Sequence, residues 1–357
     1  MRLYSGRTTL SKFLIEHCHT DQPELAALLI DVAAAVKAIS SVAGKGKLGG
    51  GYGVAGAMTI QGEGQLALDV LANELFIEHC EWSGLVAGML SAANEEPIPF
   101  KSELQRGGHL LVLDPLDGSS NIEVNVSVGS VFSVLRYQGS GTPAAADFLQ
   151  PGSKQVAAGY ALYGPCTLLV LTIGKGTHGF TLDREIGNFI LTHPNLTIEP
   201  ETCEFAINVS NERFWEPPIK RYVSECKEGA TGIRARDFNM RWIASMVADV
   251  HRILTRGGVY MYPHDTKDPH RAGRLRLLYE ANPVAFLVAQ AGGAASTGQG
   301  RIMAMEPESL DQRVPLIFGS RREIERIERY HAEFAAGTDK PYRSPLFAQR
   351  SLFRVEA

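Results

Sequence analysis

Two carboxylates lie three residues apart in the run DPLDGSSN at positions 114–121, where an apolar segment meets a proline. Because the chain must turn there, the side chains of Asp114 and Asp117 can converge on one cation. Their mutual repulsion would be costly in a partly buried site, and a hard divalent ion removes it by accepting oxygen ligands. Gly118, Ser119 and Ser120 offer successive backbone N–H groups and hydroxyls that suit a phosphate. The run predicts a metal and a phosphate in contact.

Further acids stand where a charge is unexpected. Glu95 and Glu96 follow a stretch of apolar and small residues, Asp69 lies on a largely apolar helix, and Glu280 interrupts an apolar run. An isolated Asp-x-x-Asp is more simply a solvated turn, and each other acid alone is typical of a cap or a surface. Together they favour an oxygen-ligand site for two or more Mg²⁺ ions used in phosphoryl chemistry.

A complementary cationic set occurs in the second half of the chain. Arg241, Arg274 and Arg276 surround a segment that carries Tyr260 and Tyr262. Arginines match phosphate oxygens bidentately, while tyrosines add hydrogen bonds and an apolar wall for a sugar. A solvated surface position is the simpler interpretation of Arg276 taken alone. Zinc is disfavoured, because the histidines at 251, 264 and 270 lack tight ligand spacing.

Apolar periodicity places these residues on alternating helices and strands. Helices are predicted over about 25–39, 66–80, 243–254 and 275–290, the last broken or kinked by Pro283. Strands are predicted over about 109–113, 126–137, 156–163, 167–173, 205–209 and 259–262. The pattern favours a layered α/β or α+β protein. The proline-containing segment 193–200 is the candidate domain boundary.

The glycine-rich stretch at positions 44–49 matches G-x-G-x-x-G, the fingerprint of dinucleotide-binding loops. That fingerprint requires a preceding strand and a following helix, because the pyrophosphate sits on the helix N-terminus. Here the match follows a predicted helix, which favours a mobile loop.

Composition limits the possible partners and location. Among 357 residues, 35 Lys and Arg oppose 39 Asp and Glu, for a formal net charge of -4, which disfavours nucleic acid and anionic membranes as partners. The longest apolar stretches fall short of the roughly 20 residues that cross a bilayer. Five cysteines without a C-x-x-C pair fit reduced thiols. We expect a cytoplasmic protein.

Two motifs resemble the class I fructose-1,6-bisphosphatases. The run 114–121 is shared by the wider lithium-sensitive, magnesium-dependent sugar phosphatases, whereas GRLRLLYEANP at 273–283 is much more specific. The run SMVADVH at 245–251 adds to it, and similarity extends from about Thr8 to Gly319. The resemblance implies a five-layer αβαβα sandwich and hydrolysis of the 1-phosphate of fructose 1,6-bisphosphate. It also implies a homotetramer.

Carried over position by position, the resemblance implies the following site. The metal ligands would be Glu95, Asp114, the Leu116 carbonyl, Asp117 and Glu280, holding Mg²⁺ with Mn²⁺ as a substitute. Asp69 and Glu96 would orient and deprotonate the attacking water, and Gly118, Ser119 and Ser120 would cradle the reacting phosphate. Asn208, Tyr260, Tyr262, Arg274 and Arg276 would contact the sugar or the other phosphate, with Arg241 reaching the neighbouring subunit's site. The implied domains are 1–197, with most metal ligands, 198–336, for the sugar phosphate, and a tail at 337–357.

Three departures from the family pattern affect the distal phosphate. Trp242 stands where relatives have a tyrosine hydroxyl, Asn211 where they often have another tyrosine, and Arg274 where they have a lysine. A longer sugar would move its distal phosphate toward these positions. A sedoheptulose 1,7-bisphosphatase, or an enzyme for both substrates, is therefore the alternative, and a catalytically silent regulatory paralogue is a third.

AMP, the usual allosteric inhibitor of the family, lacks most of its expected contacts. Pro23 and Ala26 occupy positions where relatives offer a backbone N–H and a hydroxyl, and Gly108-His109 replaces a Lys-Tyr pair. Only Glu24 and Arg136 remain. The sequence predicts an enzyme that is insensitive to AMP or that responds to a different effector.

Overall fold

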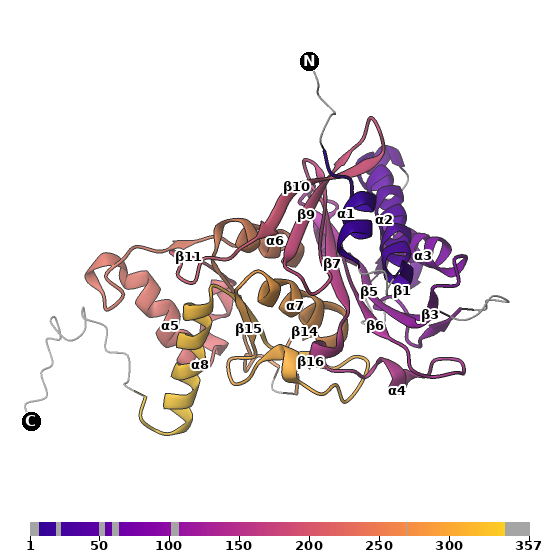
Figure 1. Ribbon diagram of the computed structural model, residues 1–357. Coiled ribbons are helices and arrows are strands. Elements are labelled where there is room, and N and C mark those ends of the chain that lie inside the picture. The colour runs from indigo at the N-terminus through magenta and orange to yellow at the C-terminus, as the bar shows by residue number, and fades with distance from the viewer. Residues whose placement is uncertain are drawn as a thin grey trace, which may run out of the picture.

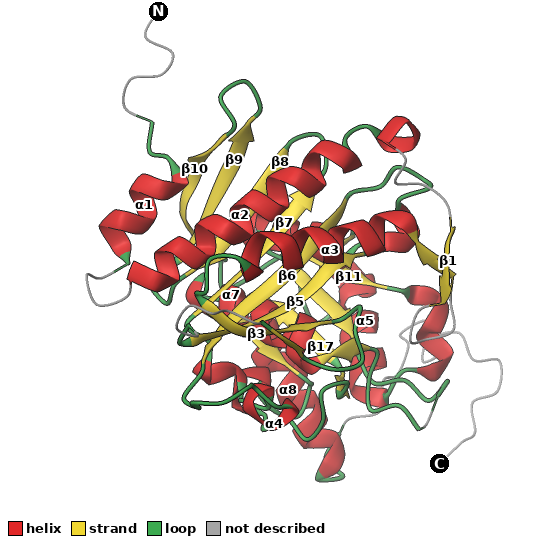
Figure 2. Ribbon diagram, turned by 90° about the vertical axis from the view of Figure 1, so that its right-hand side faces the viewer, coloured by secondary structure: helices red, strands yellow, loops and turns green. Residues whose placement is uncertain are grey.

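The computed structural model describes residues 7–18, 23–49, 54–58, 64–100, 107–268 and 270–339. Within these ranges two β-sheets alternate with three layers of helices (Figures 1 and 2). The order is α1–α3, the larger sheet, α6 with α7, the smaller sheet, and α5 with α8. The fold is the five-layer αβαβα sandwich that the sequence implied.

The outer layer of the first half consists of helices that follow the predicted apolar spacing. They are α1 (Leu10–His17), α2 (Pro23–Ala43) and α3 (Ala67–Glu81). By length and composition α2 could cross a bilayer, and it is longer than the apolar stretch recognised in the sequence. Its residues Leu28, Val32 and Val36 are instead fully buried against the larger sheet. Burial of this kind is typical of a core helix in a layered protein.

The larger sheet has the strand order β10-β9-β8-β7-β6-β5-β3-β4, and of its adjacent pairs only β3–β5 is parallel. The strands are β3 (Val86–Ser91), β4 (Ile98–Pro99), β5 (His109–Asp117), β6 (Val128–Arg136), β7 (Ala157–Tyr163), β8 (Thr167–Thr172), β9 (Thr177–Asp183) and β10 (Asn188–Leu196). Central β5 is buried on both faces, since Leu111 joins the core under α1–α3 while Val112 packs with Tyr279 on the opposite side. This double burial explains its continuous apolar run.

The smaller sheet has the order β12-β11-β13-β17-β15. Its strands are β11 (Glu204–Ile207), β12 (Asn239–Met240), β13 (Val259–Tyr262), β15 (Ala294–Ser296) and β17 (Leu316–Gly319). On one side it packs on α6 (Met246–Arg256) and α7 (Asn282–Gln290), and on the other on α5 (Pro217–Glu228) and α8 (Arg321–Ala335). Gly257 ends α6 at a φ of 75°, where a glycine is favoured.

Short elements complete the described chain. They are β1 (Val54–Met58) with β2 (Gly64–Leu66), β14 (Leu275–Arg276) with β16 (Arg313–Val314), and α4 (Ala145–Phe148). The glycine-rich stretch forms a 3₁₀ turn, η1 (Gly46–Gly49), after α2, so the part of the predicted mobile loop that is described has a regular turn. The chain passes from one sheet to the other between Leu196 and Glu204. We propose the domain boundary at residues 197/198, within this passage.

Two sequence predictions were wrong in a way that matters for the site. The strand expected to stop at Leu113 continues through Pro115 to Asp117. The helix expected over 275–290 is three elements: strand β14, a π-helical turn η6 (Leu277–Ala281), and α7. Pro283 does not kink a helix but lies in the first turn of α7, where its missing N–H costs no hydrogen bond. All five cysteines are free, as predicted.

Candidate active site

The end of β5 is irregular, and the irregularity brings two carboxylates together. Asp114 pairs with Val131 of β6, and Asp117 pairs with Gly129, so three steps along β5 match two along β6. Residues three apart in a regular strand point to opposite faces, and the extra residue of a bulge reverses that relation. Asp114 and Asp117 therefore share one side of the sheet, on a strand rather than on the predicted turn.

Glu280 reaches the same place from the π-helical turn. The backbone N–H of Asn282 donates to the carbonyl of Leu277, the wide turn that precedes α7. Such turns are rare in proteins, and those that do occur are often found at functional sites. They redirect a side chain without ending the helix. Asp114, Asp117 and Glu280 are all buried, and each offers an oxygen within 4.8 Å of the others. Within the described ranges, this group is the cluster that could hold a metal ion.

The electrostatics of the cluster are unbalanced. Burial, and then the charges of Asp114 and Glu280, raise the pKa of Asp117 well above its ordinary value. Burial, opposed by Arg276 and reinforced by Asp114, raises the pKa of Glu280 to about 7. Backbone N–H groups donate to two of the carboxylates, from Leu116 to Asp114 and from Val247 to Asp117, both at 3.2 Å. The chemistry of these donors fits a divalent cation, which would relieve the repulsion.

Arg276 is part of this cluster. Its Nη2 lies 3.4 Å from Asp114 Oδ2, its backbone N–H donates to Glu280 Oε2 at 2.6 Å, and its Nη1 donates to the carbonyl of Ala92 at 3.0 Å. The guanidinium thus forms ion pairs with two of the three carboxylates, Asp114 and, at 3.8 Å, Glu280. The solvated surface position that the sequence suggested for Arg276 alone is wrong, because its side chain is 13% exposed.

Stability without metal is expected to depend on pH through Glu280. Its carboxyl holds a proton to about pH 7 in the folded chain, but only to about 4.5 in the unfolded chain. Between these values the unfolded state releases the proton first, so stability falls as pH rises, by about 3 kcal/mol for this group. Urea unfolding in a chelator from pH 5 to 8 measures the loss, and Mg²⁺ at pH 8 should reverse it. Glu280→Gln should reduce the slope, and an unchanged slope would contradict the assignment.

The phosphate-binding run continues directly from β5. Gly118 has φ 77° and ψ 24°, a left-handed conformation that favours glycine, and η2 (Ser119–Asn121) follows as a 3₁₀ turn. Asn121 donates its side-chain amide to the carbonyl of Ala244 at 2.8 Å. No role was predicted for Asn121 from the sequence, and the backbone N–H of Val247 was not predicted to contact the carboxylates. Both contacts join the 114–121 segment to the second half of the chain.

The remaining predicted acids lie on neighbouring elements. Asp69 is in the first turn of α3. One turn on, Asn73 donates to Asn94 at 3.0 Å and accepts from Ser91 at 2.7 Å, which fixes the turn that carries Glu95 and Glu96. Arg276 holds the same turn through Ala92. Both glutamates are exposed, and in the described part of the chain neither they nor Asp69 belongs to the three-carboxylate group.

A group of aromatic side chains lies on β13 and just after β12. The Trp242 ring stacks on the Tyr260 ring, with 5.7 Å between the ring centroids, and lies tilted against the Tyr262 ring, with 6.1 Å between the centroids. Tyr260 is buried, and its pKa is raised well above 10 by burial and then by the charges of Asp249 and Asp117. Asn208, Asn211, Trp242 and Tyr262 line one cleft together with Asp265, to which Arg274 reaches at 3.5 Å. The structure thus brings Asn208, Tyr260, Tyr262 and Arg274 close to Asn211 and Trp242, whereas Arg276 lies in the carboxylate cluster.

Arg241 is exposed and lies beside an unusual carboxylate. Its Nε donates to Glu204 at 2.9 Å, and Glu204 also accepts from Arg252 at 3.0 Å and from Arg256 at 2.7 Å. Arg252 also pairs with Asp249 at 3.1 Å, so three guanidinium groups face two carboxylates here and one positive charge remains in excess. Within its own chain Arg241 therefore contacts Glu204, outside the aromatic cleft.

The fold and the carboxylate cluster place the chain in the class of αβαβα sugar phosphatases. The N-terminal domain model of fructose-1-6-bisphosphatase matches residues 8–194, and the C-terminal domain model matches residues 198–332. A class 1 fructose-1,6-bisphosphatase of Methylibium petroleiphilum is 54% identical, over 98% of each chain. One of Rhodospirillum rubrum is 55% identical, over 99% of each chain. A holo crystal structure of the Leishmania major fructose-1,6-bisphosphatase has a TM-score of 0.85 at 37% identity, covering 91% of this chain and 99% of its own. The chain belongs to the class I fructose-1,6-bisphosphatase family.

Proposed function

We propose that the protein hydrolyses the 1-phosphate of fructose 1,6-bisphosphate to give fructose 6-phosphate and inorganic phosphate. The observation that carries the proposal is the buried group Asp114, Asp117 and Glu280, directly followed by the left-handed Gly118 and the serine-bearing η2 turn. Full-length similarity to enzymes of that name supports the same reaction. Intact carboxylates at these positions weigh against a catalytically silent paralogue.

The metal that we propose is Mg²⁺, two or more ions per subunit, with Mn²⁺ able to replace it. Asp114, Asp117 and Glu280 would hold it together with Glu95 and the carbonyl of Leu116. All five offer oxygen ligands, which Mg²⁺ prefers. A bound divalent ion supplies Lewis acidity at the phosphoryl oxygens and lowers the pKa of water.

The protein's own side chains and backbone N–H groups would activate the water and bind the substrate. Asp69 and Glu96 would orient the attacking water and accept its proton. The N–H groups and hydroxyls of Gly118, Ser119 and Ser120 would hold the reacting phosphate, and donors fixed before the reaction stabilise its charge at no cost in reorganisation. Asn208, Tyr260, Tyr262, Arg274 and Arg276 would orient the sugar and its other phosphate.

Phosphate release from fructose 1,6-bisphosphate and from sedoheptulose 1,7-bisphosphate, each with Mg²⁺ and with chelator, tests the reaction. We expect turnover of the six-carbon substrate only with metal. A higher kcat/KM for the seven-carbon substrate would favour the alternative suggested by Trp242, Asn211 and Arg274. Absence of hydrolysis of both substrates at saturating Mg²⁺ would reject the proposed function.

We propose a homotetramer in which Arg241 binds the distal phosphate at a neighbouring subunit's site. Arg241→Ala is then expected to raise KM far more than it lowers kcat, because a distal contact binds the ground state and the transition state alike. Arg256→Ala is a matched control, since it removes another guanidinium from the same Glu204. Steady-state kinetics of both variants give the comparison.

Mixed tetramers provide the direct test of a shared site. Arg241→Ala subunits combined with Asp117→Asn subunits should regain activity, since some sites then contain both native residues. Well-mixed hybrids whose rate at substrate concentrations below the raised KM is no higher than the average of their parents would rule out the shared site. Size-exclusion chromatography with light scattering measures the tetramer independently.

We propose a cytoplasmic enzyme of gluconeogenesis or the Calvin cycle. The net charge of -4 and the burial of α2 in the core support a protein that acts on a small sugar bisphosphate, with no membrane or nucleic-acid partner. Growth of a deletion strain on a three-carbon substrate, compared with growth on carbon dioxide, separates the two pathways.

A further inference from the structure

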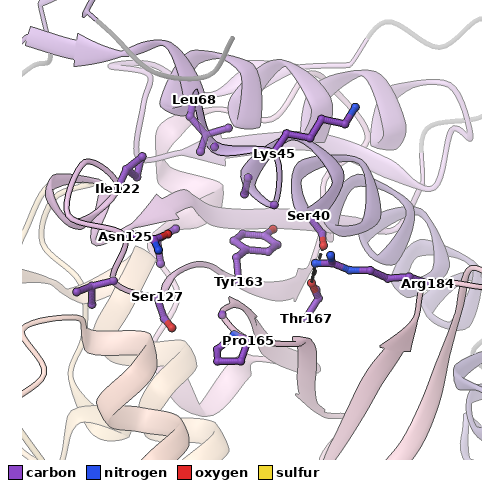
Figure 3. A pocket seen from close by; sticks show the side chains of 16 residues that line it. Ser40, Lys45, Leu68, Ile122, Asn125, Ser127, Tyr163, Pro165, Thr167 and Arg184 are labelled. Carbon is purple, nitrogen blue, oxygen red and sulfur yellow. Dashed lines mark hydrogen bonds between the residues drawn. The ribbon is translucent and has the colours of Figure 1, made fainter. Parts of the chain in front are cut away.

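A second pocket, of about 470 Å³, lies between the end of α2, the segment after η2 and the β7–β8 hairpin (Figure 3). Its walls include Leu68, Ile122 and Pro165, and its polar groups include the hydroxyls of Ser40, Tyr163 and Thr167. None of its 16 lining residues belongs to the carboxylate cluster or the aromatic cleft. The pocket is therefore separate from the site described above.

The pocket is positively charged, and no acidic side chain among its described lining residues balances that charge. Lys45 and Arg184 are its charged residues, and no Asp or Glu occurs among the described residues that line it. The adjacent Asp183 pairs with Arg7 at 3.8 Å. Figure 3 shows the Arg184 guanidinium pointing inward, where it donates to Thr167 Oγ1 at 3.4 Å. A guanidinium held by one long hydrogen bond to a hydroxyl keeps most of its donors available.

Two further features favour an anion with an organic part. Ser40 and Thr167 share a hydrogen bond of 2.5 Å at the inner end of the pocket, so both hydroxyls lie beside the guanidinium. The Lys45 ammonium points away from the pocket in Figure 3, and rotation about its flexible side chain would bring a second positive charge to the rim. The apolar walls suit a carbon skeleton or a ring, which inorganic phosphate lacks.

We propose that this pocket binds a small organic phosphate monoester. The phosphate would take the bidentate fork of Arg184, the one hydroxyl proton that the Ser40–Thr167 pair leaves free and the Lys45 ammonium, with the carbon part against Leu68, Ile122 and Pro165. The ligand would contact two segments next to proposed site groups, because Leu68 precedes Asp69 and Ile122 follows the η2 turn that carries Ser119 and Ser120. Binding would therefore change turnover without competing for the substrate, an effect that rests on the proposed function.

Binding is measured with phenyl phosphate by isothermal titration calorimetry on the full chain, with inorganic phosphate as the comparison. We expect Arg184→Ala to weaken or remove one class of phenyl phosphate site at least tenfold, and Lys45→Ala to weaken it severalfold. Lys47→Ala is the matched control, because Lys47 is an exposed lysine only two residues further on, in the η1 turn and outside the pocket. Arg184→Lys retains the charge and should bind better than Arg184→Ala.

The experiment distinguishes failure of the pocket assignment from failure of the proposed function. Unchanged phenyl phosphate binding by a folded Arg184→Ala protein would overturn the pocket assignment, whatever the catalytic activity. Equal affinity for inorganic phosphate and phenyl phosphate would overturn the organic part of the ligand. Loss of the fold in Arg184→Ala is checked by circular dichroism, and Arg184→Lys then supplies the test. Inactivity toward bisphosphates would reject the proposed function but leave the binding result intact.

Discussion

Asp117→Asn and Glu280→Gln are each expected to lower kcat by about a thousandfold or more at saturating Mg²⁺. Each replacement removes one anionic oxygen ligand from a group of three buried carboxylates and changes the side-chain volume very little. Loss of about 4 kcal/mol of transition-state stabilisation corresponds to a factor of about a thousand. Initial rates of phosphate release, at several metal concentrations, provide the measurement.

The same variants should keep their fold. Burial, and after it the repulsion between carboxylates, raises the pKa of both groups, and a neutral amide avoids both costs, so the metal-free melting temperature at pH 8 should equal or exceed that of the parent. Glu123→Gln is the control, since Glu123 is an exposed acid close in sequence to the motif and outside the cluster. Near-normal turnover by a folded Asp117→Asn protein would remove the metal assignment.

AMP is expected to inhibit this enzyme at concentrations at least a thousandfold above those effective on regulated relatives. The structure brings the relevant positions together, because Glu24 lies near Gly108, and His109 pairs with Arg136 across β5 and β6. His109 is buried, and burial, opposed by the charge of Glu24 and reinforced by that of Arg136, lowers its pKa. A neutral imidazole there adds no positive charge for a phosphate.

The size of the effect follows from the lost contacts. Pro23 begins α2 without an N–H to donate, Ala26 has no hydroxyl, and Gly108 has no side chain. Each charge-assisted contact is worth about 1.5–3 kcal/mol, so two losses of about 2 kcal/mol each already weaken binding by about a thousandfold, and a third adds at least another tenfold. An AMP inhibition curve at fixed substrate tests this, with AMP binding measured by calorimetry. Half-inhibition at micromolar AMP would show that other residues form the regulatory site.

The apolar pattern of the sequence was sufficient to predict many of the elements, but it missed α5 and α8, the helices of one outer layer. The α2 face of Leu25, Leu29, Val32 and Val36 is buried as its spacing predicts, and Gly257 ends α6 where expected. These successes share a cause, since burial of one face imposes a period on the sequence. The order of the strands leaves no such trace, because pairing joins residues distant in the chain.

The geometry of the site was not predictable to the same degree. Pro115 was interpreted as the end of a strand, whereas a bulge lets β5 accommodate it and turns Asp117 to the side of Asp114. The sequence around Glu280 has an ordinary helical pattern. The π-helical turn there can be recognised only from its hydrogen bonds. Arg276 was expected to face the substrate, but its ion pairs with Asp114 and Glu280 depend on tertiary packing.

The carboxylate cluster joins parts of the chain that lie far apart in sequence, as the Arg276–Asp114 contact spans 162 positions. Asn121 and Val247 add two further links between the halves. Contacts of such long range form late in folding, because the entropy of closing a large loop must be overcome first. Recovery of catalysis during refolding should therefore lag behind recovery of helical circular dichroism. The interval between the two signals would measure how long these long-range contacts take to form after the helices.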